Sequence, residues 1–189
     1  MGFLDALLGR RQPRRPDLDQ LFGLPSAALT LEVAAGFRPT GLGSVCVKSV
    51  EGGAFARTQA DIQALLDADG GPKVEESRDE YGFTWLVVRH EPAELSALVA
   101  DLHAVNVSLQ DAGFGPMLLC SLAGFRDGDG RRIGLVYLYK RGTFYPFAPQ
   151  GGERRDTGLE LRVRAQIESD LRVENDLSRW FPVWGAPGL

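Results

Sequence analysis

Two apolar segments joined by a short glycine-rich turn constrain the fold of this chain more than any other feature. Residues 117–126 and 132–140 flank the sequence Asp127-Gly128-Asp129-Gly130. Asp-Gly pairs between apolar runs are typical of β-hairpins, because glycine adopts the positive φ angles that such turns need. We therefore expect two neighbouring antiparallel strands here.

The second of these segments has apolar residues on both of its faces. From Ile133 to Leu138 they occupy odd and even positions alike, apart from one glycine. Successive side chains of a strand point to opposite faces, so both faces are expected to be covered. The segment is thus predicted to lie inside a sheet. Residues 143–147 are predicted as an edge strand, because Pro146 cannot donate a ladder hydrogen bond.

Helical periodicity lies before and after these strand signals. Leucine and valine recur at alternating spacings of three and four from Leu95 to Leu109, as in an amphipathic helix. Similar stripes predict helices over residues 53–68 and 157–171. Thr157 and Glu160 have the spacing of a capping box, in which two side chains satisfy the first backbone N–H groups of a helix.

Further strand signals stand in the first half of the chain. Residues 28–33 and 44–50 predict two strands, because a Gly- and Pro-containing turn separates them. Residues 73–80 and 83–90 predict a second hairpin. Hairpins that alternate with helices, in the order ββα-ββα-ββ(β)-α, favour an α+β fold. We expect an antiparallel or mixed sheet with helices covering one face.

The chain divides into three parts by composition. Residues 1–16 form an amphipathic and basic N-terminal segment, residues 17–173 form one α+β domain, and residues 174–189 form an aromatic C-terminal tail. A length of 189 residues, 44% of them hydrophobic, suits a single globular domain.

Charge and hydropathy restrict the partners and the compartment. The chain carries 21 Lys and Arg against 25 Asp and Glu, so a general nucleic-acid binder is disfavoured. No run approaches the roughly 18 apolar residues of a membrane span, and the apolar start is too short for a secretory signal. We expect a cytoplasmic protein. Residues 1–15 combine an apolar helical face with four arginines and could make weak contact with the inner membrane; packing on the protein's own core is the alternative.

Two motifs that resemble ligand loops are incomplete. The stretch from Gly41 to Cys46 begins like a dinucleotide-binding loop but lacks its third glycine. A calcium loop beginning at Asp127 would need a glutamate at its twelfth position, where Leu138 stands.

The remaining residues suited to catalysis are few. Cys46 and Cys120 lie in apolar segments and are interpreted as small buried hydrophobes. Two histidines without a spaced carboxylate make a poor metal-ligand set. We expect no catalytic residues, no metal and no cofactor, although a hydrolase whose residues meet only in space stays open.

Basic and aromatic residues near the end of the domain are the best candidates for binding. Arginine and exposed aromatic side chains are typical of interfaces, so this region could bind an anion or an acidic partner. The alternatives are a basic turn beside a packed aromatic cluster, and a tail that covers the core. The residues predicted to bind are Lys140, Arg141, Phe144, Tyr145, Arg154, Trp180 and Trp184.

Several stretches spread over nearly the whole chain together resemble one family, the PspA-associated protein B (PspAB) family of actinobacteria and related bacteria. The stretches are MGFLDALLG at residues 1–9, LPSAA at 24–28, GFRPTG at 36–41, LLDA at 65–68, DLHAVN at 101–106, YLYKRGTFYPFAP at 137–149 and LSRWFPVWG at 177–185.

The resemblance implies a link to the phage-shock response to envelope stress. Its implied partners are PspA, a peripheral membrane protein, and an HtpX-like membrane protease. With no recognisable catalytic motif, we expect a non-enzymatic adaptor or regulator at the cytoplasmic side of the membrane. There are two alternatives. One is a domain that binds small anions or ligands, and the other is a chaperone-like module that binds partner segments.

Overall fold

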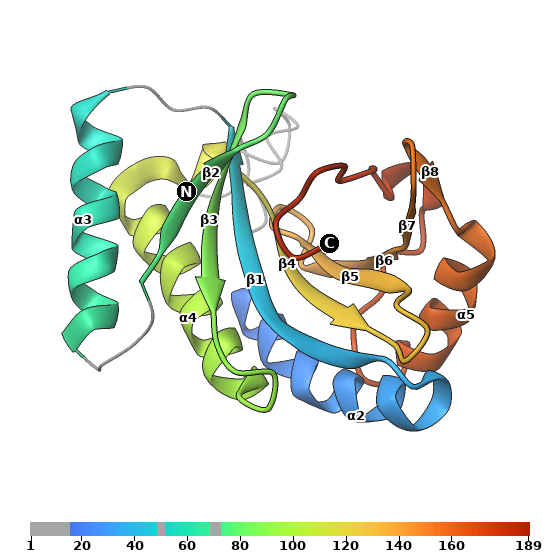
Figure 1. Ribbon diagram of the computed structural model, residues 1–189. Helices are drawn as coiled ribbons and strands as arrows, with labels where there is room; N and C mark the ends of the chain where they lie inside the picture. Colours follow the sequence, from blue (N-terminus) through green and yellow to red (C-terminus); the bar gives the residue numbers. More distant parts are fainter. Residues whose placement is uncertain (1–15, 49–51, 69–72) are drawn as a thin grey trace, which may run out of the picture.

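The computed structural model of the protein describes residues 16–48, 52–68 and 73–189. They form a six-stranded sheet in the order β2-β3-β1-β4-β5-β6 and a separate ribbon of β7 and β8 (Figure 1). The strands are β1 (Arg38–Lys48), β2 (Glu75–Arg78), β3 (Phe83–Arg89), β4 (Leu118–Arg126), β5 (Arg132–Leu138), β6 (Thr143–Phe147), β7 (Pro149–Gln150) and β8 (Arg154–Arg155). The α-helices are α2 (Leu24–Ala35), α3 (Gly53–Ala68), α4 (Leu95–Leu109) and α5 (Thr157–Ile167).

Short turns of other helix types complete the elements. They are η1 (Leu18–Gly23), η2 (Gln110–Phe114), η3 (Gly115–Met117) and η4 (Leu177–Arg179). The predicted membrane contact of residues 1–15 lies outside the described residues.

Every strand pairing within the six-stranded sheet is antiparallel. This confirms the predicted α+β fold. Of the antiparallel and the mixed sheet that the sequence allowed, the protein has the antiparallel one. Strand β1 lies between the two predicted hairpins and pairs with β3 on one side and β4 on the other. In this register Cys46 lies opposite Trp85 on one neighbour and opposite Cys120 on the other.

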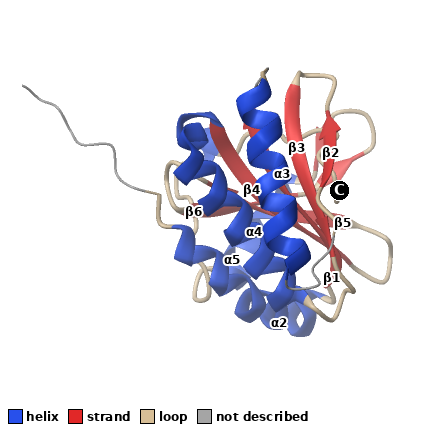
Figure 2. Cartoon of the chain, turned by 90° about the vertical axis from the view of Figure 1, so that its left-hand side faces the viewer, coloured by secondary structure: helices blue, strands red, loops and turns tan. Residues whose placement is uncertain are grey.

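Helices cover one face of the sheet, as predicted (Figure 2). The buried stripe of α4 includes Leu98 and Leu102, which pack against β1. A Cβ atom at Gly43 would lie 2.9 Å from Leu102 Cδ1, closer than real Cβ contacts. The glycine therefore lets α4 approach the sheet.

The C-terminal tail covers part of the opposite face. Trp180 and Ala186 are buried against it, and the tail crosses in front of the sheet in Figure 1. A Cβ atom at Gly124 would lie 2.4 Å from the backbone oxygen of Gly188, so β4 and the tail touch through their backbones. The sheet residues of this second core are Cys46, Trp85, Val87, Cys120, Leu122, Val136, Tyr145 and Phe147.

The predicted strand at residues 28–33 is wrong, because this segment belongs to helix α2. Leu24, Ala28 and Leu31 are buried on one side of α2 at helical spacing. Pro25 suits the first helical turn, and Gly36 ends the helix in the left-handed conformation, with φ = 72°. The strand begins only afterwards, at Arg38.

The predicted capping box at the start of α5 is also wrong. Asp156, one residue earlier, caps the helix, and its side chain accepts from Leu159 N at 2.9 Å. Glu160 is fully buried and accepts instead from Ala148 N and from Arg155.

The hairpin predicted around Asp127 is confirmed, with Arg126 paired to Arg132. Asp127 accepts from Asp129 N and Arg131 N and so closes the turn. The edge position of β6 and the interior position of β5 are confirmed as well.

Candidate functional site

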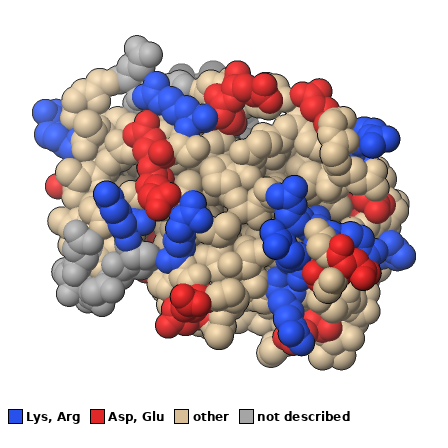
Figure 3. Space-filling view, viewed as in Figure 1, with Lys and Arg blue, Asp and Glu red and all other residues tan. Residues whose placement is uncertain are grey.

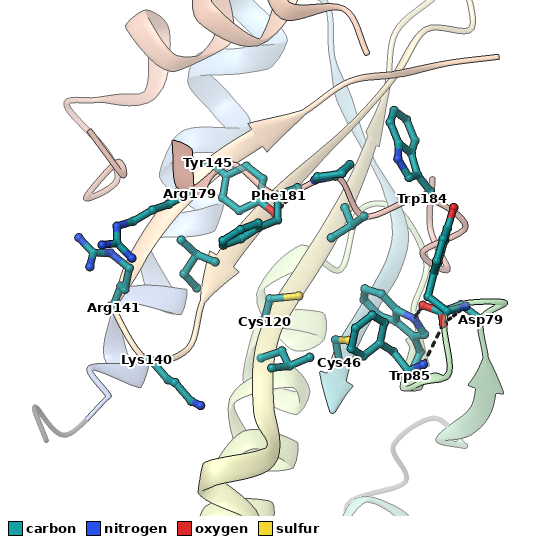
Figure 4. Close-up of a pocket in the computed structure, with 16 residues that line it drawn as sticks. Cys46, Asp79, Trp85, Cys120, Lys140, Arg141, Tyr145, Arg179, Phe181 and Trp184 are labelled. Carbon is teal, nitrogen blue, oxygen red and sulfur yellow. Dashed lines mark hydrogen bonds between the residues drawn. The ribbon is translucent and has the colours of Figure 1, made fainter. Parts of the chain in front are cut away.

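An apolar pocket of about 560 Å³ lies between the sheet and the C-terminal tail. Its floor includes Trp85 of β3, Cys46 of β1 and Cys120 of β4, and the tail contributes Phe181 and Trp184 (Figure 4). The other lining residues are Asp79, Tyr81, Phe83, Leu119, Leu138, Lys140, Arg141, Tyr145, Arg179, Pro182 and Val183. In the orientation of Figure 1, uncharged residues occupy the middle of the surface and charges lie mainly around it (Figure 3).

One end of the pocket holds a carboxylate whose oxygens are already bonded. Asp79 Oδ2 accepts from Trp85 Nε1 at 2.9 Å. Its Oδ1 accepts from the backbone N–H groups of Tyr81 and Phe83 at 3.0 and 2.9 Å. Asp79 therefore closes the β2–β3 turn and orients the Trp85 ring in the pocket floor.

Three cations lie toward the opposite end, separated from Asp79 by the two cysteines (Figure 4). Arg141 is paired with the buried carboxylate of Glu174, and Arg179 lies 3.0 Å from Asp176. Lys140 makes no ion pair or hydrogen bond within the described part of the chain. Two of the three positive charges are thus neutralised, and that of Lys140 is not.

The Arg141–Glu174 pair holds the tail against the edge of the sheet. Glu174 also accepts from Thr143 Oγ1 and Asp176 N, both at 3.0 Å. Burial by itself would raise the pKa of the Glu174 carboxyl, but these hydrogen bonds outweigh it and hold that pKa below its ordinary value. Glu174 is therefore a structural anion at neutral pH.

The two cysteines are directly opposite each other on neighbouring strands and both line the pocket. Both are free thiols and both are buried, as expected from the sequence. A hydrogen bond with Cys120 and burial in the apolar floor raise the pKa of the Cys46 thiol far above its ordinary value. Because the thiolate is the reactive form, Cys46 is a poor nucleophile.

We expect Cys46 to be alkylated by iodoacetamide at pH 8 at least about tenfold more slowly in the folded protein than in urea, since both burial and the raised pKa suppress the thiolate. Time-resolved labelling with peptide mass spectrometry measures this rate. Equal rates in buffer and urea would show that the thiol is accessible and ionised, contrary to the packing described above.

The structure brings together four of the seven residues predicted to bind. Lys140, Arg141, Tyr145 and Trp184 all line the pocket. Tyr145 is only 1% exposed, and its hydroxyl donates to Phe181 O at 2.7 Å.

The other three predicted residues lie elsewhere. Phe144 is fully buried on the helix-covered face, where its ring packs against Tyr137, so we remove it from the binding surface. Trp180, within the tail, is buried against the sheet and stacks on Tyr145 with ring centres 6.0 Å apart. Arg154 is exposed in the β7–β8 ribbon and does not line the pocket.

Several pocket residues were absent from the predicted set. Cys46, Cys120 and Trp85 come from three strands whose mutual register is not encoded locally. Phe181 is 57% exposed, and its place in an aromatic tail was the one sequence signal available.

A histidine–carboxylate pair lies outside the pocket, at the end of β3. His90 Nε2 and Asp101 Oδ2 are 2.6 Å apart, which ties β3 to α4. His90 N also donates to Gly41 O at 2.8 Å. Among residues 16–48, 52–68 and 73–189, no three His, Cys, Asp or Glu are grouped as metal ligands would be.

The helices of residues 16–48, 52–68 and 73–189 are all too short or too polar to cross a bilayer.

An antiparallel sheet with helices on one face and a tail-covered apolar pocket on the other defines an α+β protein with a candidate binding site. The chain belongs to the PspA-associated protein B family, whose sequence model matches residues 1–188. This confirms the resemblance seen in the sequence. No curated protein and no solved structure matches the chain.

Proposed function

We propose that the protein is a non-enzymatic adaptor or regulator that associates with a PspA-type protein in the envelope-stress response, at the cytoplasmic side of the membrane. The observation that carries the proposal is family membership over residues 1–188, because the family's name refers to association with PspA. For the same reason PspA, and not an HtpX-like protease, is the proposed partner.

The chemistry of the pocket supports binding rather than catalysis. Asp79 has both carboxylate oxygens in hydrogen bonds to the protein itself. These three bonds occupy most of the roughly four acceptor positions of a carboxylate and fix Asp79 in the turn. A nucleophilic thiol needs a lowered pKa. The raised pKa of Cys46 is the opposite of that requirement.

Exposed groups around the pocket offer a contact surface for the partner. Lys140 is exposed and unpaired within the described residues, and the side chain of Arg141 is 42% exposed. Phe181 adds a large exposed aromatic ring beside them. A cationic edge next to an aromatic residue suits an acidic partner surface with an apolar centre.

The test is co-purification of PspA with the tagged full-length protein from cells under envelope stress. We expect Lys140→Glu to reduce PspA recovery at least about fivefold, because it turns attraction into repulsion at an exposed position. Arg141 is unsuitable for this test, since its replacement would leave the buried Glu174 unpaired.

Lys73→Glu makes the same charge change at an exposed lysine that does not line the pocket, and serves as the matched control. PspA recovery is expected to match that of the unaltered protein. Absence of PspA from the unaltered protein would refute the adaptor proposal, and equal loss in both variants would refute the assignment of the surface.

A further inference from the structure

The pocket has the size and lining of a small-molecule site. Its volume of about 560 Å³ lies within the range of roughly 300–1,000 Å³ usual for such sites. Side chains such as Leu119, Leu138 and Val183 make most of its wall, and charges stand only toward its ends. A ligand that fills it must therefore have an apolar body.

The Lys140 ammonium group is the one cation lining the pocket that has no ion-pair partner among the described residues. Arg141 and Arg179 are neutralised by Glu174 and Asp176, and no such partner faces Lys140 within the described part of the chain. The Asp79 carboxylate, toward the other end, would repel an anion. The charged group of a ligand is thus expected to be one anion at the Lys140 end.

We propose that the pocket binds a single-chain amphiphile with an anionic head group, either a carboxylate or a phosphate. The head group lies beside Lys140, and the hydrocarbon chain runs over Cys46 and Cys120 toward Trp85. This site goes beyond the association with PspA and does not depend on it.

A polar ligand or a peptide fits the floor less well. Buried side-chain oxygens without a hydrogen-bond partner, such as Thr84 Oγ1 and Asn106 Oδ1, lie outside the pocket, so they cannot bind a sugar or nucleotide there. Strands β1 and β4 are interior strands whose backbone groups are used by neighbours on both sides. A peptide laid on them would find few backbone partners, whereas a hydrocarbon chain needs none.

The test titrates the purified full-length protein with sodium dodecanoate, dodecyl phosphate and uncharged dodecanol, the two anions below micelle formation and the alcohol below its solubility limit. Calorimetry and tryptophan fluorescence follow binding, because Trp85 and Trp184 line the pocket. We expect saturable binding of one molecule per chain. Dodecanoate or dodecyl phosphate is expected to bind at least about fivefold more tightly than dodecanol, because an ammonium–anion hydrogen bond is charge-assisted.

Two variants locate the site. In Lys140→Ala, the anions are expected to bind no more than about twofold more tightly than dodecanol, while the affinity for dodecanol is unchanged. In the control Lys73→Ala, the affinities for the anions and for dodecanol are expected to be unchanged. Val183→Trp fills the pocket from the tail and is expected to weaken all three amphiphiles at least about tenfold in a protein that remains folded by circular dichroism.

The relative affinities of dodecanoate and dodecyl phosphate identify the source of the head group. Preference for dodecanoate indicates a free fatty acid, and preference for dodecyl phosphate indicates a lipid phosphate; both support the proposal. Absence of saturable binding, equal affinity for dodecanol and both anions, or an anion preference that survives Lys140→Ala would each overturn it.

Discussion

Replacing Glu160 with alanine is expected to lower the free energy of unfolding by about 3 kcal/mol. The Glu160 side chain is 1% exposed and bonds the Arg155 guanidinium, whose side chain is 24% exposed. It also accepts from Ala148 N at 2.9 Å. The alanine variant leaves a half-buried cation and a buried N–H without their acceptor, and removal of one partner costs more than the pair itself contributes. Because Arg155 keeps some contact with water, we expect a loss of stability at the lower end of the roughly 3–5 kcal/mol that removal of one partner of a buried ion pair costs.

Urea denaturation monitored by circular dichroism measures this loss. Glu168→Ala, at the exposed C-terminal cap of the same helix, is the matched control and is expected to change stability by less than about 0.5 kcal/mol. The double variant Arg155→Met/Glu160→Leu is expected to lose less than Glu160→Ala, since it removes the unpaired charge. A loss below about 1 kcal/mol for Glu160→Ala would contradict the role given to this pair.

The elements predicted well are those whose pattern is local. The hairpin at Asp127 follows from turn chemistry, and α4 follows from a repeated apolar spacing. The failure at residues 28–33 has a physical cause, because Leu29, Leu31 and Val33 alternate as in a strand, whereas in helix α2 Leu31 is buried and the other two are exposed. Tertiary packing of Leu31 and the end signal of Gly36 decide for the helix, and only the latter stands in the sequence.

The candidate site was predictable only in part, because it depends on contacts distant in sequence. Lys140 and Arg141 were found by their charge. The prediction placed Phe144 and Tyr145 on one surface, although adjacent residues of a strand point to opposite faces. The structure turns Tyr145 to the pocket and Phe144 to the helices. The pairing of Cys46 with Cys120 spans 74 residues, from 46 to 120, and no local pattern specifies it.

Replacing Trp180 with alanine is expected to lower the free energy of unfolding by about 3–5 kcal/mol and to open the pocket. Trp180 is 5% exposed and stacks on Tyr145 with ring centres 6.0 Å apart. Its Nε1 donates to Glu174 O at 3.0 Å, and its backbone oxygen accepts from Arg155 at 2.7 Å. The tail is thus fixed at Trp180, and we expect loss of this anchor to displace Phe181, which follows directly and lines the pocket.

Two readouts separate a loosened tail from general destabilisation. Urea denaturation reports the loss of stability, and limited trypsin cleavage after the exposed Arg179 reports detachment of the tail under native conditions. Trp184→Ala is the matched control: that ring is only half-buried and touches Phe147 edge-on at 4.9 Å, so a loss of about 1–2 kcal/mol is expected. If Trp180→Ala and Trp184→Ala cost the same and cleavage after Arg179 is unchanged, the tail is held elsewhere. The pocket would then not depend on Trp180, and its covering residues would be held by the other contacts of the tail, the Arg141–Glu174 pair and the bond from the Tyr145 hydroxyl to Phe181 O.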